Sequence, residues 1–302
     1  MSISEKYRSL FYSLAAVLFW STIATAFKLT LKGMNSFQLV FYAALTSTIV
    51  LGIFALRKNR NLFKVLFLKE NLTKNLLMGI INPFVFYFVL IKAYDLLIAQ
   101  EAMILNYSWP IVLSIFSVIF FKDKFSFKTI LGLLTAFAGV IFIATHGNLL
   151  ELEFHNPLGI SLALASTFIW SGFWILNLHD KRDDVIKLFG AFFFGTIYTA
   201  VYILFFDSFK VDNSIYIFGA VYIGLFEMGI TFVLWLKGLS LSKNRANTST
   251  LVFLSPFLSL IFIALILGEE LYISSLVGLV LIIGGILIQQ LGKKKTQLST
   301  KV

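Results

Sequence analysis

Apolar residues fill long blocks of this chain, and short polar segments separate the blocks. Blocks of about 18 to 22 residues recur, which is the length a helix needs to cross a hydrocarbon layer about 30 Å thick. The pattern predicts an all-α membrane protein with ten transmembrane helices. The weakest of the ten is 75–91, because it contains Asn82 and Pro83 and ends beside Lys92. We place the spans at 9–27, 37–56, 75–91, 99–121, 128–145, 157–178, 188–206, 215–237, 248–267 and 272–291.

The second half of the chain repeats landmarks of the first at a spacing of about 146 to 150 residues. The matched landmarks are Trp20-Ser21 with Trp170-Ser171, Pro110 with Pro256, Gly132 with Gly278, and Gly139 with Gly285. Each half holds an odd number of spans, so the second must enter the membrane from the opposite side. We therefore predict two inverted five-helix repeats, 1–148 and 149–302. This arrangement is typical of secondary transporters that bind substrate near the bilayer midplane. The glycines also suit close packing of 128–145 against 272–291.

Charge supports the membrane assignment and sets an orientation. Only 13% of the residues are charged, against about 25% in soluble domains. With a cytoplasmic N-terminus, all but four of the 25 Lys and Arg residues lie on the cytoplasmic side. The exceptions are Lys28, Lys32, Lys92 and Lys210. This bias predicts that both termini face the cytoplasm of a bacterial inner membrane. The net charge is +10. Because the basic residues lie beside the spans, we expect them to contact anionic lipid, and we expect no nucleic acid partner.

The N-terminal segment also resembles a secretory signal peptide. Lys6 and Arg8 precede an apolar run that ends in Ala24-Thr25-Ala26, a small-residue pattern typical of cleavage sites. Cleavage there would remove one span and break the repeat, so we expect the segment to stay as the first span.

Glu227 is the outstanding single residue, because it lies near the middle of the predicted span 215–237. A carboxylate at the bilayer centre costs several kcal/mol even on lenient insertion scales. Glu227 must therefore face protein or water, pair with a group on another helix, or stay protonated. It is a candidate for contact with a substrate amine or for proton coupling, and a packing role is the alternative.

Tryptophans form a second candidate group. Trp20, Trp109, Trp170 and Trp174 lie within spans, where an inward aromatic wall encloses apolar ligands or attracts a cation. Trp170, Trp174 and Asn177 share one helix face by their spacing. The alternative is an interfacial belt, which best suits Trp235 beside Lys237.

Two prolines mark predicted helix breaks at corresponding points of the halves. Pro110 ends the segment Asn106-Tyr107-Ser108-Trp109-Pro110, and Pro256 follows Ser255. A proline inside a span removes a backbone hydrogen bond, and paired broken helices indicate a binding site in transporters. A purely structural kink is the alternative.

Signals for an enzyme, a metal or a cofactor are missing. The chain has no cysteine, no Walker A loop and no Gly-x-Ser-x-Gly motif. His146, His155 and His179 lack metal-ligand spacing, and we expect Glu151, Glu153, Glu269 and Glu270 to be solvated in outer loops. We expect no catalytic residues, no metal and no cofactor. The expected partners are a small-molecule substrate and membrane lipid. Proton coupling and the oligomeric state are left open.

The repeat, its prolines and its glycines resemble the drug/metabolite transporter superfamily of EamA type, over residues 9–291. Three segments resemble its bacterial aromatic amino-acid exporter branch: Leu18–Thr22, Asn106–Pro110, and Phe168–Ser171 with Asn177. The resemblance implies that Trp20, Tyr107, Trp109 and Trp170 line a central cavity. Glu227 departs from that branch, in which no matching acid is known.

We therefore expect an exporter of small amphipathic metabolites, with amino acids first, that works by alternating access through rocking of the halves. Spans one to four and six to nine would surround the cavity, and spans five and ten would brace its edge. The alternatives are an intramembrane enzyme on lipid or sugar substrates, an exporter of drugs or nucleotide-related metabolites, and a non-transporting subunit.

Overall fold

The fold was analysed in a computed structural model, which describes residues 3–121, 127–148, 156–242, 248 and 250–299. Within these ranges the chain forms helices and no strand, so the all-α prediction is confirmed. The predictions for Glu151, Glu153 and His155 lie outside the described residues.

Six helical segments are long and apolar enough to cross a membrane: Tyr7–Leu31, Ser36–Lys58, Lys69–Leu96, Pro157–Asn177, Asp184–Phe206 and Ile215–Ser240. Three shorter apolar helices cover Ile130–Ile143, Leu251–Leu267 and Ile273–Ile288. The predicted span 99–121 is split into two helices. The chain is therefore a multi-pass membrane protein, while the number of ten spans stays a prediction.

The contacts divide the chain into two units, each built from both ends of the sequence. Unit 1 holds residues 1–91 and 180–268, and unit 2 holds 92–179 and 269–302. The first elements of unit 1 are α1 Ile3–Ser21, α2 Ile23–Leu31, α3 Ser36–Lys58, α4 Leu62–Phe67, α5 Lys69–Gly79 and the π-helix η1 Ile80–Val85. Its later elements are α11 Asp184–Phe206, α12 Ile215–Ile223, the π-helix η2 Gly224–Gly229, α13 Ile230–Ser240, the 3-10 helix η3 Thr250–Phe253, α15 Leu254–Phe262 and the π-helix η4 Ile263–Leu267. Unit 2 contains α7 Ala99–Asn106, α8 Trp109–Phe121, α9 Phe127–Ala144, α10 Pro157–His179 and α16 Ile273–Ser299, and α6 Phe86–Leu96 crosses the boundary.

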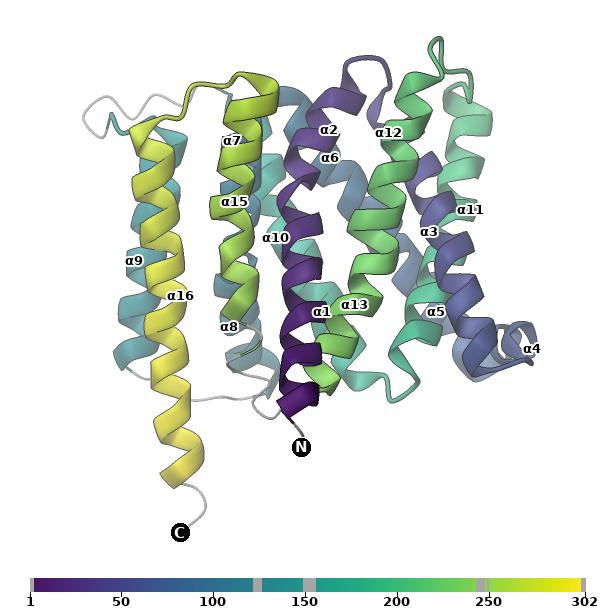
Figure 1. The fold of residues 1–302 in the computed structure, drawn as a ribbon, viewed down its shortest axis with the longest axis horizontal. Coiled ribbons are helices and arrows are strands. Elements are labelled where there is room, and N and C mark those ends of the chain that lie inside the picture. Colours follow the sequence, from purple (N-terminus) through teal and green to yellow (C-terminus); the bar gives the residue numbers. More distant parts are fainter. Residues whose placement is uncertain (1–2, 122–126, 149–155, 243–247, 249, 300–302) are drawn as a thin grey trace. The chain divides into compact units, whose positions relative to one another are not determined.

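Unit 1 packs helices of the first sequence half against helices of the second. The helix α1 lies along α13, and α3 lies along α11 (Figure 1). Local signals fix where these helices begin. Asn35 and Gln38 form a reciprocal capping box at the start of α3, and such a box satisfies two backbone donors that the helix leaves free.

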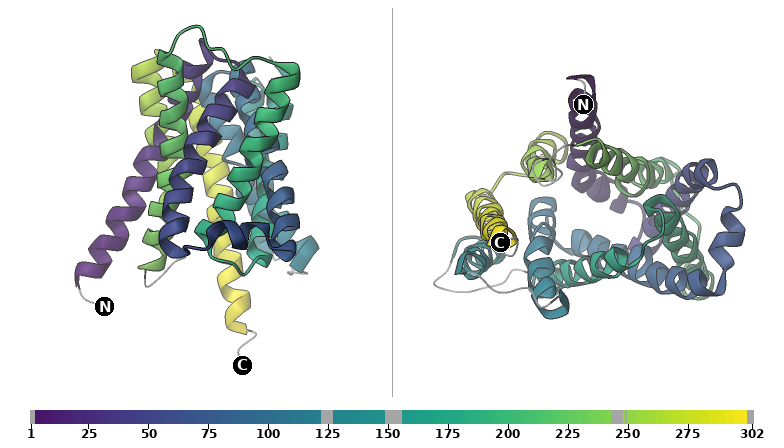
Figure 2. Two further views of the ribbon diagram at one scale, coloured as in Figure 1. Left: turned by 90° about the vertical axis from the view of Figure 1, so that its right-hand side faces the viewer. Right: turned by 90° about the horizontal axis from the view of Figure 1, so that it is seen from below.

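The predicted close contact of segments 128–145 and 272–291 is confirmed in unit 2. There α9 and α16 lie side by side along their length, as both views in Figure 2 show. Glycines allow this approach. A Cβ atom on Gly139 would lie 2.7 Å from the Gly278 carbonyl oxygen, and one on Gly285 would lie 2.4 Å from that of Gly132. Small residues are what lets transmembrane helices pack at such distances.

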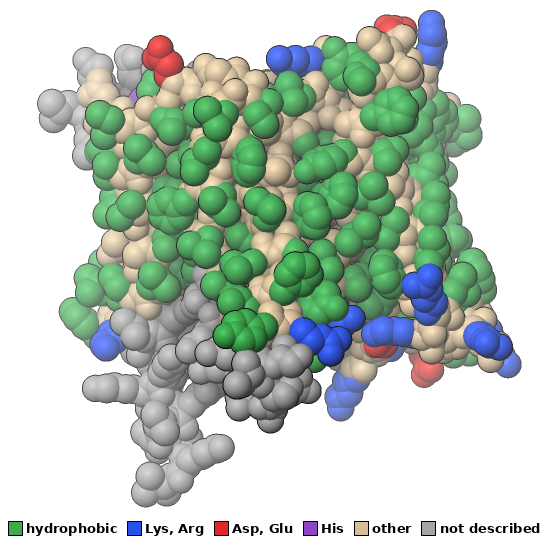
Figure 3. Space-filling model, in the orientation of Figure 1, with side chains coloured by type: hydrophobic (Ala, Val, Ile, Leu, Met, Phe, Trp, Pro, Cys, Tyr) green, Lys and Arg blue, Asp and Glu red, His purple; other side chains and the backbone are tan. Residues whose placement is uncertain are grey.

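On the surface of unit 1, apolar and basic side chains occupy different regions. Large apolar side chains cover its helix flanks, and examples are Ile49 at 58% exposure and Phe205 at 72%. Lys and Arg gather over the end where α4 lies (Figure 3). Exposed apolar area on this scale is typical of a surface that contacts lipid.

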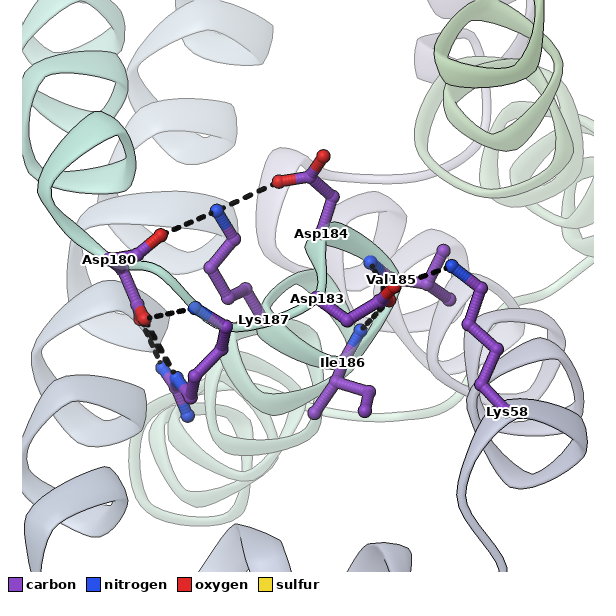
Figure 4. A network of polar contacts seen from close by, with 8 residues as sticks. Lys58, Asp180, Asp183, Asp184, Val185, Ile186 and Lys187 are labelled. Carbon is purple, nitrogen blue, oxygen red and sulfur yellow. Dashed lines mark hydrogen bonds and ion pairs between the residues drawn. The ribbon is translucent and has the colours of Figure 1, made fainter. Parts of the chain in front are cut away.

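A polar network fastens the start of α11 to neighbouring helices within unit 1 (Figure 4). Arg182 donates to the Asp180 carboxylate at distances between 2.6 and 3.0 Å, and to Asn75 Oδ1 at 2.8 Å. The buried Lys187 donates to the Asp180 carbonyl oxygen at 3.0 Å. At the other side, Lys58 pairs with Asp183 at 2.6 Å, and Asp183 caps α11 through the N–H groups of Val185 and Ile186.

The two paired acids of the network keep their charge. Partial burial acts to raise the pKa of Asp180, but the hydrogen bonds from Arg182 outweigh it and hold that pKa below its usual value. Burial also opposes ionisation of Asp183, and the bonds from Lys58 and the helix N–H groups again lower the pKa. Both carboxylates therefore favour the packed state at neutral pH.

Candidate functional site

Glu227 lies in a break of the helical segment Ile215–Ser240. The α-helical pattern changes to the π-helix η2 over Gly224–Gly229, and π-segments inside α-helices are frequent at functional sites. Gly224 is required by packing, because a Cβ atom there would lie 2.4 Å from the Ala43 carbonyl oxygen on α3.

Side chains satisfy backbone carbonyl groups at this break. The indole Nε1 of Trp20 donates to the carbonyl oxygen of Glu227 at 3.3 Å. The hydroxyl of Thr231 donates to the carbonyl oxygen of Phe226 at 2.5 Å. Irregular backbone at membrane depth requires such partners, since lipid offers none. Trp20 is therefore a residue that holds the position of Glu227, in addition to the lining role that the sequence suggested.

The carboxylate of Glu227 contacts a neutral donor. The hydroxyl of Tyr87 on α6 donates to Glu227 Oε1 at 3.2 Å, and the Tyr87 side chain is fully buried. Within the described ranges, no Lys, Arg or His forms an ion pair with Glu227. A carboxyl group in this setting can take up a proton or the cation of a ligand. Sequence reasoning missed Tyr87, which is one of eleven tyrosines and lies 140 positions from its partner.

Aromatic rings surround the break. Phe19 stacks on Phe226 with ring centroids 4.4 Å apart. Trp20 meets Trp235 edge-on at 5.4 Å and Phe232 at 5.9 Å. The ring of Trp235, for which the sequence favours an interfacial belt, is thus in contact with the ring of Trp20. The neighbourhood of Glu227 is thus apolar and aromatic apart from a few hydroxyl groups.

The second group of predicted residues lies in unit 2, at the break between α7 and α8. The helix α7 ends at Asn106, and α8 begins at Trp109. Asn106 donates from Nδ2 to the Ser166 hydroxyl at 2.8 Å. Ser171 donates to the Trp109 carbonyl oxygen at 3.0 Å. Both serines belong to α10, so this helix holds the break in place. Tyr107 and Pro110 lie in the same break and are partly exposed.

The remaining predicted residues follow each other along α10. Trp170 stacks on Phe173 at 5.7 Å and meets Trp174 edge-on at 5.8 Å. Asn177 is 9% exposed. The indole Nε1 of Trp174 is buried and has no hydrogen-bond partner in the described part of the chain. A buried donor without a partner costs about 1 to 3 kcal/mol, and an acceptor group on a ligand would remove that cost.

The start of α7 corrects one sequence prediction. We had expected Glu269 to be solvated, but its carboxylate accepts from the backbone N–H groups of Ala99 and Gln100 at 2.9 and 3.4 Å. The fully buried Gln100 adds bonds to the Glu270 carbonyl oxygen and the Tyr272 N–H group. A negative charge at a helix N-terminus is favourable, so Glu269 positions the helix that leads to Asn106.

The predicted site residues therefore fall into two groups. Trp20, Glu227 and Pro256 belong to unit 1, and Pro256 lies in the first turn of α15. Asn106, Tyr107, Trp109, Pro110, Trp170, Trp174 and Asn177 belong to unit 2. Among the described residues, no three His, Cys, Asp or Glu side chains come together in a way that could hold a metal.

Comparison with known proteins supplies the family. The model of the EamA-like transporter family matches the chain twice, over residues 8–145 and 157–289. An uncharacterized transporter of Archaeoglobus fulgidus is 23% identical over 90% of this chain and 95% of its own length. The aromatic amino acid exporter YddG of Escherichia coli is 24% identical over 65% of this chain and 69% of its own. A protein crystal structure 20% identical to this chain shares the fold with a TM-score of 0.66, over 95% of this chain and 98% of the other. With both matches together spanning most of its length, the chain belongs to the EamA-like transporter family.

Proposed function

We propose that this protein is a secondary transporter that exports small amphipathic metabolites, with amino acids as the leading class, across a bacterial inner membrane. One observation carries the proposal. A carboxyl group, Glu227, lies in a broken transmembrane helix, and its hydrogen-bond partner is a neutral phenol rather than a cation. Buried ionisable groups in membrane spans usually mark substrate or ion pathways. The similarity to the aromatic amino acid exporter YddG adds support for the amino-acid class.

The chemistry of the two residue groups suits an amphipathic ligand. Glu227 offers a site for an ammonium group or a proton, and Trp20 supplies an aromatic surface beside it. In unit 2, the free N–H of Trp174 offers a donor to a carboxylate, and Trp109 and Trp170 offer apolar contact. We propose that each group, taken within its own unit, contributes to substrate binding. The driving force is a substrate or ion gradient, because the sequence contains no ATP-binding loop.

We further propose ten spans in two inverted repeats and an alternating-access cycle. Breaks at corresponding places support the repeat: η1 in the segment Lys69–Leu96 matches η2 in Ile215–Ser240. The sequence halves interleave within each unit. The bodies that move in the proposed cycle are therefore not the halves themselves, in contrast to the rocking of halves that the sequence suggested.

Both termini are expected to face the cytoplasm, because Lys and Arg favour that side so strongly. A fluorescent protein fused to the C-terminus should be bright, and alkaline phosphatase at the same place should be inactive. The same two reporters in the predicted outer loop at Lys210 serve as the inverse control. An active phosphatase at the C-terminus would reverse the proposed topology.

Transport itself is tested with purified full-length protein in liposomes. We expect flux of at least one amino acid, with aromatic ones tested first after a thermal-shift screen against metabolites. Protein-free liposomes are the control. Chemical conversion of a lipid or sugar without flux would instead support an enzyme. Flux confined to drugs or nucleotides would replace the proposed substrate class.

A further inference from the structure

A side-chain hydrogen bond joins two broken helices in unit 1. The segment Lys69–Leu96 is broken at η1, and Ile215–Ser240 is broken at η2. Tyr87 lies on α6 just after the first break, and Glu227 lies inside the second. The 3.2 Å bond from the Tyr87 hydroxyl to Glu227 Oε1 therefore connects a helix of the first sequence half with its counterpart in the second.

The strength of this bond depends on a proton. An ionised carboxylate accepts from a phenol in a charge-assisted bond, which is about twice as strong as a neutral one. A protonated carboxyl group has lost that charge and holds a donor of its own. The Tyr87–Glu227 bond is thus strongest when Glu227 is ionised and weakens when Glu227 binds a proton. The phenol ring is fully buried, so water cannot replace its hydroxyl without movement of the helices.

The break at η1 allows α6 to move when the Tyr87–Glu227 bond changes. Asn82 in η1 has a non-helical backbone, and both polar atoms of its buried side chain lack a hydrogen-bond partner among the described residues. A buried amide without partners is costly and marks a place where the structure has a reason to rearrange. Tyr87 lies five residues after Asn82, so movement at η1 acts on the Tyr87–Glu227 bond.

Other titratable groups near η2 are engaged elsewhere. The helices packed against η2 are α1, α3, α12 and α13. Tyr42 on α3 donates to the Phe209 carbonyl oxygen, and Tyr222 on α12 bonds Thr22. Lys237 on α13 lies over the ring of Tyr12 on α1, while Tyr216 packs on Gly33. The charged Arg8, Arg57 and Lys58 lie toward helix ends.

We propose that Tyr87 is the residue that couples the proton occupancy of Glu227 to the position of α6, through the hydrogen bond between the two side chains. The inference rests on the proposed function and deepens it by naming the proton as the coupling ion. With Glu227 ionised, Tyr87 fastens the two broken helices to each other. When Glu227 takes up a proton, this hydrogen bond weakens and α6 becomes free to move relative to α5, with η1 as the hinge. Tyr87 is a positioning residue and does not itself exchange the proton.

The test titrates Glu227 in the full-length protein in lipid nanodiscs by infrared difference spectroscopy. The band of the protonated carboxyl group is assigned by its loss in Glu227→Gln. Tyr87→Phe keeps the ring and removes the donor, so the midpoint of the band should move to higher pH by on the order of one unit. Tyr42→Phe, which also removes one hydrogen-bonded phenol, should leave the midpoint in place. An unchanged midpoint in folded Tyr87→Phe protein overturns the proposal.

A second measurement covers the case in which Tyr87→Phe does not fold. Fluorinated tyrosine at position 87 keeps the ring and makes the hydroxyl a stronger donor, so the midpoint should move to lower pH. Hydrogen–deuterium exchange of residues 83–96, corrected for the intrinsic pH effect, should rise as the wild-type protein passes below its midpoint. In Glu227→Gln it should be high at every pH. Hydrogen–deuterium exchange of this segment that does not change with the protonation of Glu227 overturns the coupling. Absence of transport by the wild-type protein in liposomes overturns only the proposed function.

Discussion

Replacing Glu227 by Gln is expected to abolish flux driven by a pH gradient and to leave substrate exchange across the membrane intact. The substitution keeps the size and shape of the side chain but removes its exchangeable proton. Substrate still binds, and the variant still exchanges substrate when it is present on both sides of the liposome membrane, because neither step consumes a proton. The measurement compares gradient-driven uptake with exchange in the same liposomes, at a fixed amount of folded protein.

Glu101→Gln is the matched control, because Glu101 is a second acid within a helix, is buried, and contacts His146 in unit 2. It should keep gradient-driven flux. If Glu227 holds a substrate ammonium group instead, its loss removes a charge-assisted bond of about 1.5 to 3 kcal/mol. Affinity would then fall by about ten- to a hundredfold in both assays. No change in affinity, exchange or pH response would make Glu227 a packing residue.

Replacing Gly285 by Val is expected to prevent stable packing of α16 on α9. The new Cβ atom would lie 2.4 Å from the Gly132 carbonyl oxygen and 2.7 Å from the Ala136 Cβ atom. Backbone atoms cannot turn aside as a flexible side chain can, so the two helices must separate along their contact. Overpacking typically costs about 1 to 3 kcal/mol, and a clash with backbone belongs at the upper end. We expect little folded protein in detergent extracts.

The neighbouring glycine provides an internal control for this prediction. A Cβ atom on Gly284 meets nothing within 4 Å, and Val has the same effect on helix propensity at both positions. Gly284→Val should therefore elute and unfold like the wild-type protein in size-exclusion and thermal assays. Equal losses in both variants would mean that the helix tolerates no Val here, and that the α9 contact is not the cause.

The helices could be predicted from the sequence because lipid imposes a simple rule on composition. A run without charge must be long enough to cross, and the segments Ser36–Lys58 and Asp184–Phe206 obey that rule closely. Break positions were harder to predict. The weak span 75–91 contains η1, as its Asn82 and Pro83 suggested, but the break around Glu227 has no proline to signal it. This break coincides with close packing of Gly224 on α3, a tertiary contact that the sequence does not reveal.

The pairing of individual distant side chains could not be predicted from the sequence. A single sequence cannot reveal that Tyr87 meets Glu227, since nothing local distinguishes this tyrosine from the others. Glu269 was wrongly expected to be solvated for the same reason: its partners are N–H groups about 170 residues away. The family assignment is confirmed, while the roles of Trp20, Trp109 and Trp170 in a cavity remain predictions.

The interleaved units have a consequence for how the protein is made. Unit 1 is interrupted between residues 91 and 180, so Lys58 and Asn75 leave the ribosome well before Asp183 and Arg182 are synthesised. At about 5 to 20 residues per second, that delay is on the order of 5 to 20 s. During this time α3 and α5 are in the membrane without α11. Lys58 and Asn75 must then contact water, lipid headgroups or the insertion machinery instead of their later partners. Packing of unit 1 therefore cannot be completed before translation has passed α11, however fast the helices pack.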